Sequence, residues 1–222
     1  PLNFVGRHRE ICDIHQALKG TLTGERAQAP FVVVSGNSGF GKTQITLEYA
    51  FRFGAAYPGG VFRLSGKEAE PAAQFSQLAV NAPLKPQILA ILRQLCPETE
   101  CSEKTSLLKI RAALAEQLAQ REGDYLWIVD DLPEGINGPV IQQWLAPEKA
   151  DQRPNRAHNI LISESQRYDH RGDPIHLPLL SEVSGQMVLS GYRPPTRNDE
   201  KDSLNWLTGN PLPPYQIGRA HV

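Results

Sequence analysis

The sequence predicts an α/β domain with a doubly wound, mostly parallel, five-stranded sheet that carries helices on both faces. Two observations support this fold class. Short unbroken apolar runs, such as residues 31–34 (FVVV) and 125–129 (YLWIV), are typical of strands buried on both faces of a parallel sheet. Segments with helical apolar spacing alternate with these runs, and such alternation favours a parallel sheet that is covered on both sides.

The individual elements follow from the spacing of apolar residues. Ile11, Ile14 and Leu18 recur at helical spacing and predict the first helix. Pro178 interrupts the last apolar run, so the fifth strand is expected at an edge of the sheet. The expected strands are residues 31–34, 60–64, 125–129, 159–163 and 175–179. The expected helices are residues 8–19, 71–81, 86–95, 103–120, 181–190 and 198–207, a helix directly after residues 36–43 that carries Ile45, Leu47, Tyr49 and Ala50, and a last helix after a turn at 209–211.

Composition is that of an ordinary soluble globular protein. The chain has 222 residues, of which 40% are hydrophobic and 21% charged, and it is long enough to bury a full core. Its formal net charge of -1 gives no basic field that would draw it to nucleic acid or to an anionic membrane, so both are disfavoured as partners. No apolar run approaches the roughly 20 residues of a membrane span, and no signal peptide is evident, so a cytoplasmic location is expected.

Cysteine and histidine show no metal or disulfide pattern. Three cysteines are an odd set without the spacing of a zinc site, and we expect ordinary thiols. The six histidines are scattered, and we expect them to be solvated. These residues are Cys12, Cys96, Cys101, His8, His15, His158, His170, His176 and His221.

Residues 36–43 (GNSGFGKT) match the phosphate-loop pattern G-x-x-x-x-G-K-[ST] at every required position. Glycines let the backbone curl so that its N–H groups point at phosphate oxygens, and the following helix aims its positive end at the same place. Lys42 is expected to neutralise the terminal phosphates, and the Thr43 hydroxyl to ligate Mg²⁺. The motif predicts a sheet of the P-loop NTPase type. The expected nucleotide-binding residues are Gly36, Asn37, Ser38, Gly39, Phe40, Gly41, Lys42, Thr43 and Gln44.

The predicted strand at 125–129 ends in two carboxylates, Asp130 and Asp131. An apolar strand that ends this way is typical of the metal-side partner of a phosphate loop. We expect Asp130 to hold Mg²⁺ through water, and Asp131 to orient or deprotonate an attacking water. The alternative is that these aspartates only begin a turn after the strand.

Residues 4–10 (FVGRHRE) resemble the F-V-G-R-x-x-E opening motif of the signal-transduction ATPases with numerous domains (STAND), the class that includes NB-ARC and NACHT proteins. The resemblance continues through the phosphate loop, residues 58–65 and residues 127–131. It ends at residues 209–212 (GNPL), which resemble the G-x-P turn of a small helical domain. The resemblance implies ATP or ADP as the nucleotide, a P-loop NTPase domain over residues 1–190 and the beginning of a helical lid over residues 191–222.

The resemblance also implies residue roles and partners. Val5, Gly6 and Arg7 would lie beside the adenine and ribose, and Pro211 would close over the base from the opposite side. The alternatives are a solvated charge for Arg7 and an ordinary helix-starting proline for Pro211. The implied function is a switch, in which ATP exchange or hydrolysis changes the packing between flanking effector and sensor domains, with a homo-oligomer in the activated state.

One position departs from the pattern of this class. Its members commonly place an arginine just after the fourth strand, where it senses the γ-phosphate, and this chain has Ser165 there. The departure implies slow or absent hydrolysis by the isolated domain, unless Arg156, Arg167 or Arg171 replaces the arginine.

Two rival functions stay open from the residues alone. A structural module would hold nucleotide without turnover, and the absent arginine favours it. A small-molecule kinase would use the same phosphate loop. The chain begins at Pro1 without methionine and stops just after an apolar-rich stretch at 206–217, which predicts a piece of a longer protein and disfavours the kinase. A nucleic-acid motor is disfavoured by the neutral charge.

Overall fold

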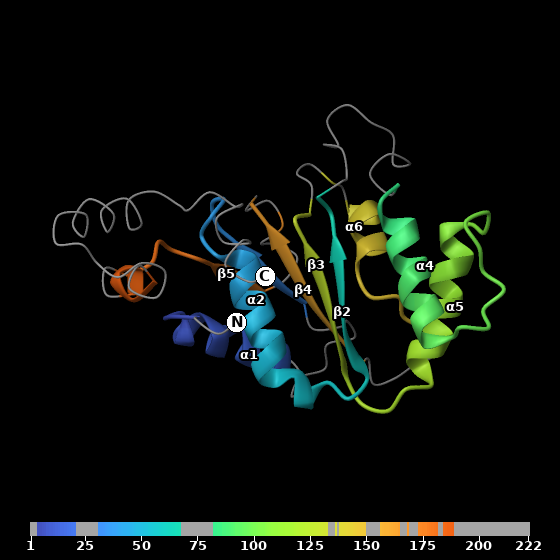
Figure 1. Ribbon diagram of the computed structural model, residues 1–222, viewed down its shortest axis with the longest axis horizontal. Helices are drawn as coiled ribbons and strands as arrows, with labels where there is room; N and C mark the ends of the chain where they lie inside the picture. The colour runs from blue at the N-terminus through green and yellow to red at the C-terminus, as the bar shows by residue number, and fades with distance from the viewer. Residues whose placement is uncertain are drawn as a thin grey trace.

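The computed structural model has a five-stranded, all-parallel sheet with helices on both faces (Figure 1). It describes residues 4–20, 31–67, 82–132, 136, 138–149, 156–164, 168, 173–181 and 184–188. The predicted α/β fold class is confirmed. None of the described helices has the length and apolar character that a bilayer crossing requires.

All five predicted strands are present, with ends that differ by a few residues. The strands are β1 (Phe31–Ser35), β2 (Gly60–Ser65), β3 (Tyr125–Asp130), β4 (Ala157–Ser163) and β5 (Asp173–His176). Their order across the sheet is β2-β3-β4-β1-β5, so β4 lies between β1 and β3. In register, Val33 faces Leu161 of β4 and Pro174 of β5. The edge position predicted for the fifth strand is therefore confirmed, but the strand ends before Pro178 and contains Pro174 instead.

Helices cover both faces of the sheet (Figure 1). Residues of α1 and α2 pack with one set of strand side chains, and residues of α4, α5 and α6 pack with the other. The bounds are α1 (His8–Gly20), α2 (Lys42–Phe53), α4 (Leu84–Leu95), α5 (Leu107–Ala119) and α6 (Gly138–Trp144), with a one-turn 3-10 helix, η2 (Gly54–Ala56), after α2.

Alternate side chains of β1 enter the two cores. Val33 belongs to the core under α4, α5 and α6, while Val32 and Val34 belong to the core under α1 and α2. Successive side chains of a strand point to opposite faces, so a strand with apolar residues at every position must be covered on both sides. This is the physical reason that unbroken apolar runs predicted the doubly wound arrangement.

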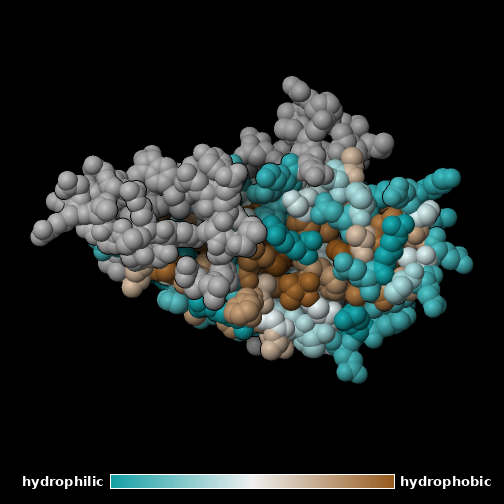
Figure 2. Space-filling model, in the orientation of Figure 1, coloured by the Kyte–Doolittle hydropathy of each residue, from teal (hydrophilic) through white to brown (hydrophobic). Residues whose placement is uncertain are grey.

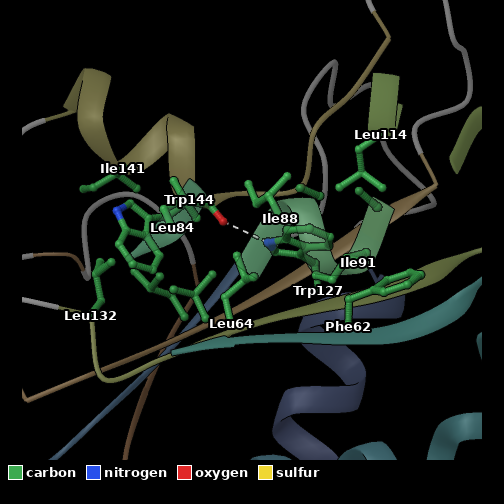
Figure 3. Close-up of a cluster of buried hydrophobic side chains, with 14 of the residues drawn as sticks. Phe62, Leu64, Leu84, Ile88, Ile91, Leu114, Trp127, Leu132, Ile141 and Trp144 are labelled. Atoms are coloured by element: carbon green, nitrogen blue, oxygen red, sulfur yellow. Dashed lines mark hydrogen bonds between the residues drawn. The ribbon is translucent and has the colours of Figure 1, made fainter. Parts of the chain in front are cut away.

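The core under α4 and α6 is built around two tryptophans (Figure 3). The Trp127 indole Nε1 donates a hydrogen bond to the Trp144 carbonyl oxygen at 2.8 Å, which fixes the end of α6 above β3. Sequence analysis did not predict α6. The helix has only seven residues and Pro139 at its second position, so it offers little periodicity to recognise.

Two other expected helices differ from the observed structure in extent. The helix expected at 103–120 begins only at Leu107, because the Ser106 side chain accepts a hydrogen bond from the Lys109 amide at 3.5 Å and caps it. Of the helix expected at 181–190, the described residues 184–188 are helical. The helices expected at 71–81, at 198–207 and after 211 lie outside the described residues, as does the lid expected over 191–222.

A polar cluster is buried between α2 and the amino end of β4. His158 Nδ1 lies 3.3 Å from the Tyr57 hydroxyl, which is hydrogen-bonded at 2.7 Å to the Tyr49 hydroxyl, and His158 Nε2 lies 3.6 Å from Asp124 Oδ2. The prediction of a solvated imidazole is wrong for His158, because the side chain is fully buried. Burial, assisted by the positive charge of Lys19, lowers the pKa of His158 to about 4.

We expect this histidine to make the protein sensitive to acid. Below pH 6.5 the imidazole takes up a proton in the unfolded chain but not in the folded one, so the free energy of unfolding falls as the pH drops from 6.5 towards 4. The slope contributed by this one group is on the order of 1 kcal/mol per pH unit. Urea unfolding at several pH values checks this. His158→Gln should flatten the dependence, while substitution of the exposed His8 should not; an equally steep dependence in His158→Gln would contradict the assignment.

Candidate nucleotide-binding site

The phosphate loop connects β1 to α2 and forms a tight curl. The Phe40 amide donates to the Asn37 carbonyl at 3.2 Å within the loop, and the Ile45 amide donates to the Gly41 carbonyl at 2.9 Å where α2 begins. Gly41 has a φ of 86°, and a Cβ atom at this position would meet no other atom among the described residues. Glycine is therefore needed here for its backbone conformation and not for lack of space. Asn37 and Ser38 are exposed at the loop, and Gly39 and Gln44 are half-buried.

Lys42 points back into this curl. Its Nζ donates to the carbonyl oxygens of Gly36 at 2.8 Å and Asn37 at 3.0 Å, and it lies 3.8 Å from Glu164 Oε1. The side chain is only 7% exposed. Burial lowers the pKa of Lys42, and the negative charges of Glu164, Asp131 and Asp130 oppose that shift. The ammonium group is therefore held among loop carbonyls, where phosphate oxygens would replace them.

Thr43 and Asp130 meet at the carboxyl edge of the sheet. Thr43 follows β1 and Asp130 ends β3, and β4 lies between these two strands. The Thr43 hydroxyl donates to Asp130 Oδ1 at 2.9 Å, and Asp130 is 1% exposed. A hydroxyl and a carboxylate side by side are the oxygen donors that Mg²⁺ prefers. No cluster of three or more His, Cys, Asp or Glu side chains is placed to hold a metal in the part of the chain that the structure describes. The two residues fit a magnesium ion whose other ligands are phosphates and water.

Asp131 directly follows Asp130 but has a different environment. Its backbone has a φ of 53°, uncommon for a residue other than glycine, and its side chain reaches solvent. Partial burial raises the pKa of Asp131, the charge of Asp130 raises it further, and the charges of Lys42 and Lys67 oppose the rise. A carboxyl with a raised pKa beside the phosphate loop is suited to accept a proton from water.

Arg63 is a site residue that sequence analysis missed. Its Nη2 lies 2.5 Å from Asp130 Oδ2, so both carboxylate oxygens of Asp130 have partners. Arg63 comes from β2, in which Ser65 is in register with Asp130. The strand period of two places Arg63 and Ser65 on one face, and this could have pointed to Arg63 once β2 and β3 were known to pair.

The amino-terminal residues reach the phosphate loop through Arg7. Its guanidinium contacts the carbonyl oxygen of Phe40 at 3.4 Å, while Val5 and Gly6 are half-buried beside it in the chain. Arg156 is wrong as a substitute γ-phosphate sensor, because it precedes β4 and donates to the Arg121 carbonyl, at the end of the strand away from the loop. Ser165, Arg167, Arg171 and Pro211 lie outside the described residues.

The family can now be stated from the comparisons with known proteins. The description "AAA ATPase domain" applies to the family that matches residues 3–177, a range that includes the phosphate loop, Arg63, Asp130 and Asp131. The chain belongs to this family. The AAA ATPase domain is a P-loop domain, so the match supports the predicted site for ATP.

Solved structures similar to this AAA domain share its fold. One is the structure of Drosophila ORC bound to DNA, with a TM-score of 0.61 and 15% identity over 96% of this chain and 52% of that chain. Another is Cdc6p from Pyrobaculum aerophilum, with a TM-score of 0.59 and 13% identity over 85% of this chain and 49% of that chain. The Aeropyrum pernix Orc1 protein in complex with DNA is also similar, with a TM-score of 0.57 and 14% identity over 86% of this chain and 50% of that chain. This chain spans about half the length of each. Identities this low show the fold alone, and curated protein sequences give no match.

Arg63 should compete with Mg²⁺ for Asp130, because both cations need the same carboxylate. The Arg63 side chain is 46% exposed, and an ion pair this open is worth at most about 1 kcal/mol, so Arg63→Met should tighten Mg²⁺ binding in the presence of saturating ADP by up to roughly fivefold. Titration calorimetry with Mg²⁺ measures this. Arg93→Met, which removes an exposed arginine of α4, is the control. Weaker Mg²⁺ binding in Arg63→Met would show that Arg63 supports the metal site instead.

Proposed function

We propose that this AAA domain binds ATP or ADP with Mg²⁺ and serves as a slowly hydrolysing nucleotide switch within a longer protein. The observation that carries the proposal is the meeting of three groups at one edge of the sheet: Lys42 inside the loop curl, and Thr43 hydrogen-bonded to Asp130 beside it. These are the groups that hold the phosphates and the metal in P-loop NTPases.

Each residue of the site has a distinct role in this proposal. The loop amides and the positive end of α2 bind the phosphates, and Lys42 neutralises their terminal charge. Thr43 and Asp130 hold Mg²⁺, which would draw charge from the phosphates. Asp131 accepts a proton from the attacking water, consistent with its raised pKa and its place next to Asp130.

Assignment to the STAND class is finer than the family match. It is supported by the resemblance of residues 4–10 and 209–212, and by the half-buried position of residues 4–7 near the phosphate loop. On this assignment the partners are flanking effector and sensor domains and, in the activated state, further copies of the chain, and the location is cytoplasmic. The rivals are a module that holds nucleotide without turnover and a small-molecule kinase. ATP hydrolysis by the domain would count against both rivals.

Nucleic acid is a further candidate partner. Two of the similar structures contain DNA, so the prediction that nucleic acid is disfavoured finds no support in the comparisons. It rests on the formal net charge of -1 and on the absence of clusters of basic and aromatic residues in the sequence. Fluorescence anisotropy with labelled duplex DNA at low and physiological salt decides between a nucleotide switch and a DNA-binding one.

Nucleotide binding is tested by calorimetry with ATP, ADP and GTP in the presence of Mg²⁺. We expect ATP and ADP to bind and GTP to bind more weakly, because the STAND resemblance implies an adenine site. Lys42→Ala should weaken ATP binding by roughly ten- to a hundredfold, since it removes a charged donor to the phosphates. Lys109→Ala, on an exposed face of α5, is the matched control. Parent-like ATP affinity in Lys42→Ala would refute the site.

Asp131→Asn separates binding from chemistry. An asparagine keeps the size of the side chain but cannot take a proton, so ATP affinity should stay close to that of the parent while single-turnover hydrolysis slows by roughly a hundredfold. Comparing the two quantities in one preparation checks this. An unchanged hydrolysis rate would remove Asp131 from the chemistry and leave it as a turn residue.

Hydrolysis by this chain alone should be slow or absent. Ser165 stands where an arginine usually completes the charge around the γ-phosphate, and such an arginine is worth about 10³ to 10⁵ in rate in related P-loop enzymes. If a neighbouring domain or protomer supplies the cation, a longer, oligomerising form of the protein should turn over much faster. Single-turnover assays on both forms test this; hydrolysis by this chain alone at about 1 per second or faster would show that its own residues complete the site.

A further inference from the structure

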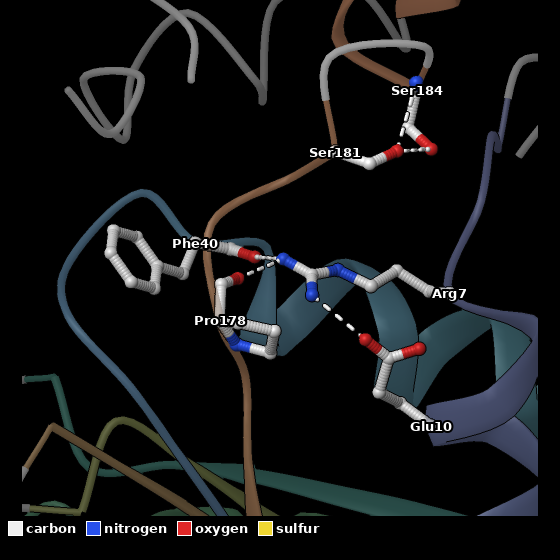
Figure 4. Close-up of polar contacts among 6 residues, drawn as sticks. All are labelled: Arg7, Glu10, Phe40, Pro178, Ser181 and Ser184. Atoms are coloured by element: carbon white, nitrogen blue, oxygen red, sulfur yellow. Dashed lines mark hydrogen bonds and ion pairs between the residues drawn. The ribbon is translucent and has the colours of Figure 1, made fainter. Parts of the chain in front are cut away.

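The Arg7 guanidinium joins three parts of the chain (Figure 4). Its Nη1 donates to Glu10 Oε1 of α1 at 2.9 Å. Its Nη2 donates to two carbonyl oxygens, that of Phe40 in the phosphate loop and that of Pro178 after β5. The side chain is only 6% exposed. The charge of Arg7 is therefore directed at the backbone of the phosphate loop and of the segment beyond the sheet.

The backbone before α1 is shaped to deliver this side chain. Gly6 and Arg7 have φ values of 72° and 58°, both in the left-handed region. A residue other than glycine persists there only when its surroundings fix it. A Cβ atom on Gly6 would lie 2.7 Å from Ser184 Oγ, so the turn is also pressed against residues 184–188. The contacts of Arg7 with Phe40 and Pro178 hold the strained turn in place.

Arginine suits a bridge between two carbonyls and a carboxylate. Its planar guanidinium presents five N–H donors in a fixed fork, whereas a lysine ammonium is a compact point charge on a flexible stem. Glu10 supplies the opposite charge that a buried guanidinium needs, because removing one partner of a buried ion pair leaves an uncompensated charge. The bridge therefore ties the phosphate loop to the segment after β5, two parts of the chain that are far apart in sequence.

The segment after β5 also borders the start of the phosphate loop. The Leu177 amide donates to the Ser35 carbonyl at 2.8 Å, and a Cβ atom on Gly36 would lie 3.0 Å from the Leu177 carbonyl oxygen. The loop thus meets this segment directly at its first residue, and through Arg7 at Phe40. A change in the curl of the loop must shift or strain these contacts.

We propose that Arg7 is a positioning residue of the phosphate loop. It holds Phe40 to Pro178 and thereby couples the affinity for phosphate to the conformation of residues 177–181. The proposal rests on the proposed function, since it takes the loop to bind phosphate. It differs from the place beside adenine and ribose that the STAND resemblance implies. Because Arg7 acts through the loop, it affects the affinity for a triphosphate whether or not the ligand carries a base.

Two ligands separate these roles: Mg²⁺ with ATP, and Mg²⁺ with inorganic triphosphate, each titrated by calorimetry. Arg7→Gln should weaken both by the same factor, about tenfold or more, because the charged hydrogen bonds that tie Phe40 of the loop to Pro178 are lost. Arg7→Lys should recover only part of the loss. Arg9→Gln removes an exposed arginine of α1 and should change neither. A loss for ATP with unchanged affinity for inorganic triphosphate would overturn the proposal and assign Arg7 to the nucleoside.

Global destabilisation is distinguished by measuring the folded fraction of each variant by urea unfolding. A variant that unfolds reversibly shows an apparent Kd that is raised for both ligands by the reciprocal of its folded fraction, so each Kd is corrected by that factor before the variants are compared. Glu10→Gln supplies a milder second variant, because it retains Arg7 and removes only its counter-charge. It should weaken both ligands in parallel, by less than Arg7→Gln does. Unchanged Kd values in both Arg7→Gln and Glu10→Gln would overturn the proposal.

Hydrogen exchange without ligand tests the bridge independently of phosphate binding. The amides of Phe40 and Leu177 are both hydrogen-bonded next to the bridge. In Arg7→Gln they should exchange at least about tenfold faster than in the parent, while the amides of β3 stay unchanged. If the parent binds neither ATP nor inorganic triphosphate, the proposed function fails, and the exchange alone decides: unchanged rates at Phe40 and Leu177 would overturn the bridge.

Discussion

The parallel pairing of β4 with β1 on one side and β3 on the other is the constraint on which the site depends. It brings three strand ends to one edge of the sheet, so that the phosphate loop, Asp130 and Glu164 converge. Thr43 can then reach Asp130 from the start of α2. Because the side-chain period of a strand is two, a slip of one residue in β3 would turn Asp130 to the opposite face and break this contact. The slip would also exchange Trp127 with a smaller side chain between the two close-packed cores, which makes it costly.

The local parts of the site were predictable, and the long-range parts were not. The phosphate loop is a contiguous pattern whose glycines are needed for the curl itself, and Asp130 follows an unmistakable buried strand. Arg63 and the bridge from Arg7 depend on which strands and loops become neighbours, and spacing along the chain does not contain that information. Arg156 failed for a different reason: it precedes the fourth strand, whereas a sensing arginine follows it, so the order of residues along the chain already placed Arg156 at the opposite end.

The charged side chains of the described site have close partners. Lys42 is held by loop carbonyls with Glu164 close by, and Asp130 is held by Thr43 and Arg63. A buried charge without such partners would cost several kcal/mol, so each contact stabilises the loop in its curled form. A bound phosphate would exchange some of these contacts for its own. Phosphate oxygens would take the place of the carbonyls around Lys42, and the measured affinity reports the difference between the two sets.

A nucleotide switch needs an element that has two arrangements, each favoured by a different ligand state. The core under α4, α5 and α6 is a continuous apolar packing around Trp127 and Trp144, and a close-packed interior of this kind resists small displacements. The other side of the site is different. The segment after β5 follows an edge strand and buries Leu177 in the core under α1 and α2, and it also meets the loop through polar contacts at Ser35 and through Arg7. Polar contacts of this kind can change partners when the loop moves, so a change at the phosphates has a direct path to residues 177–181 through them.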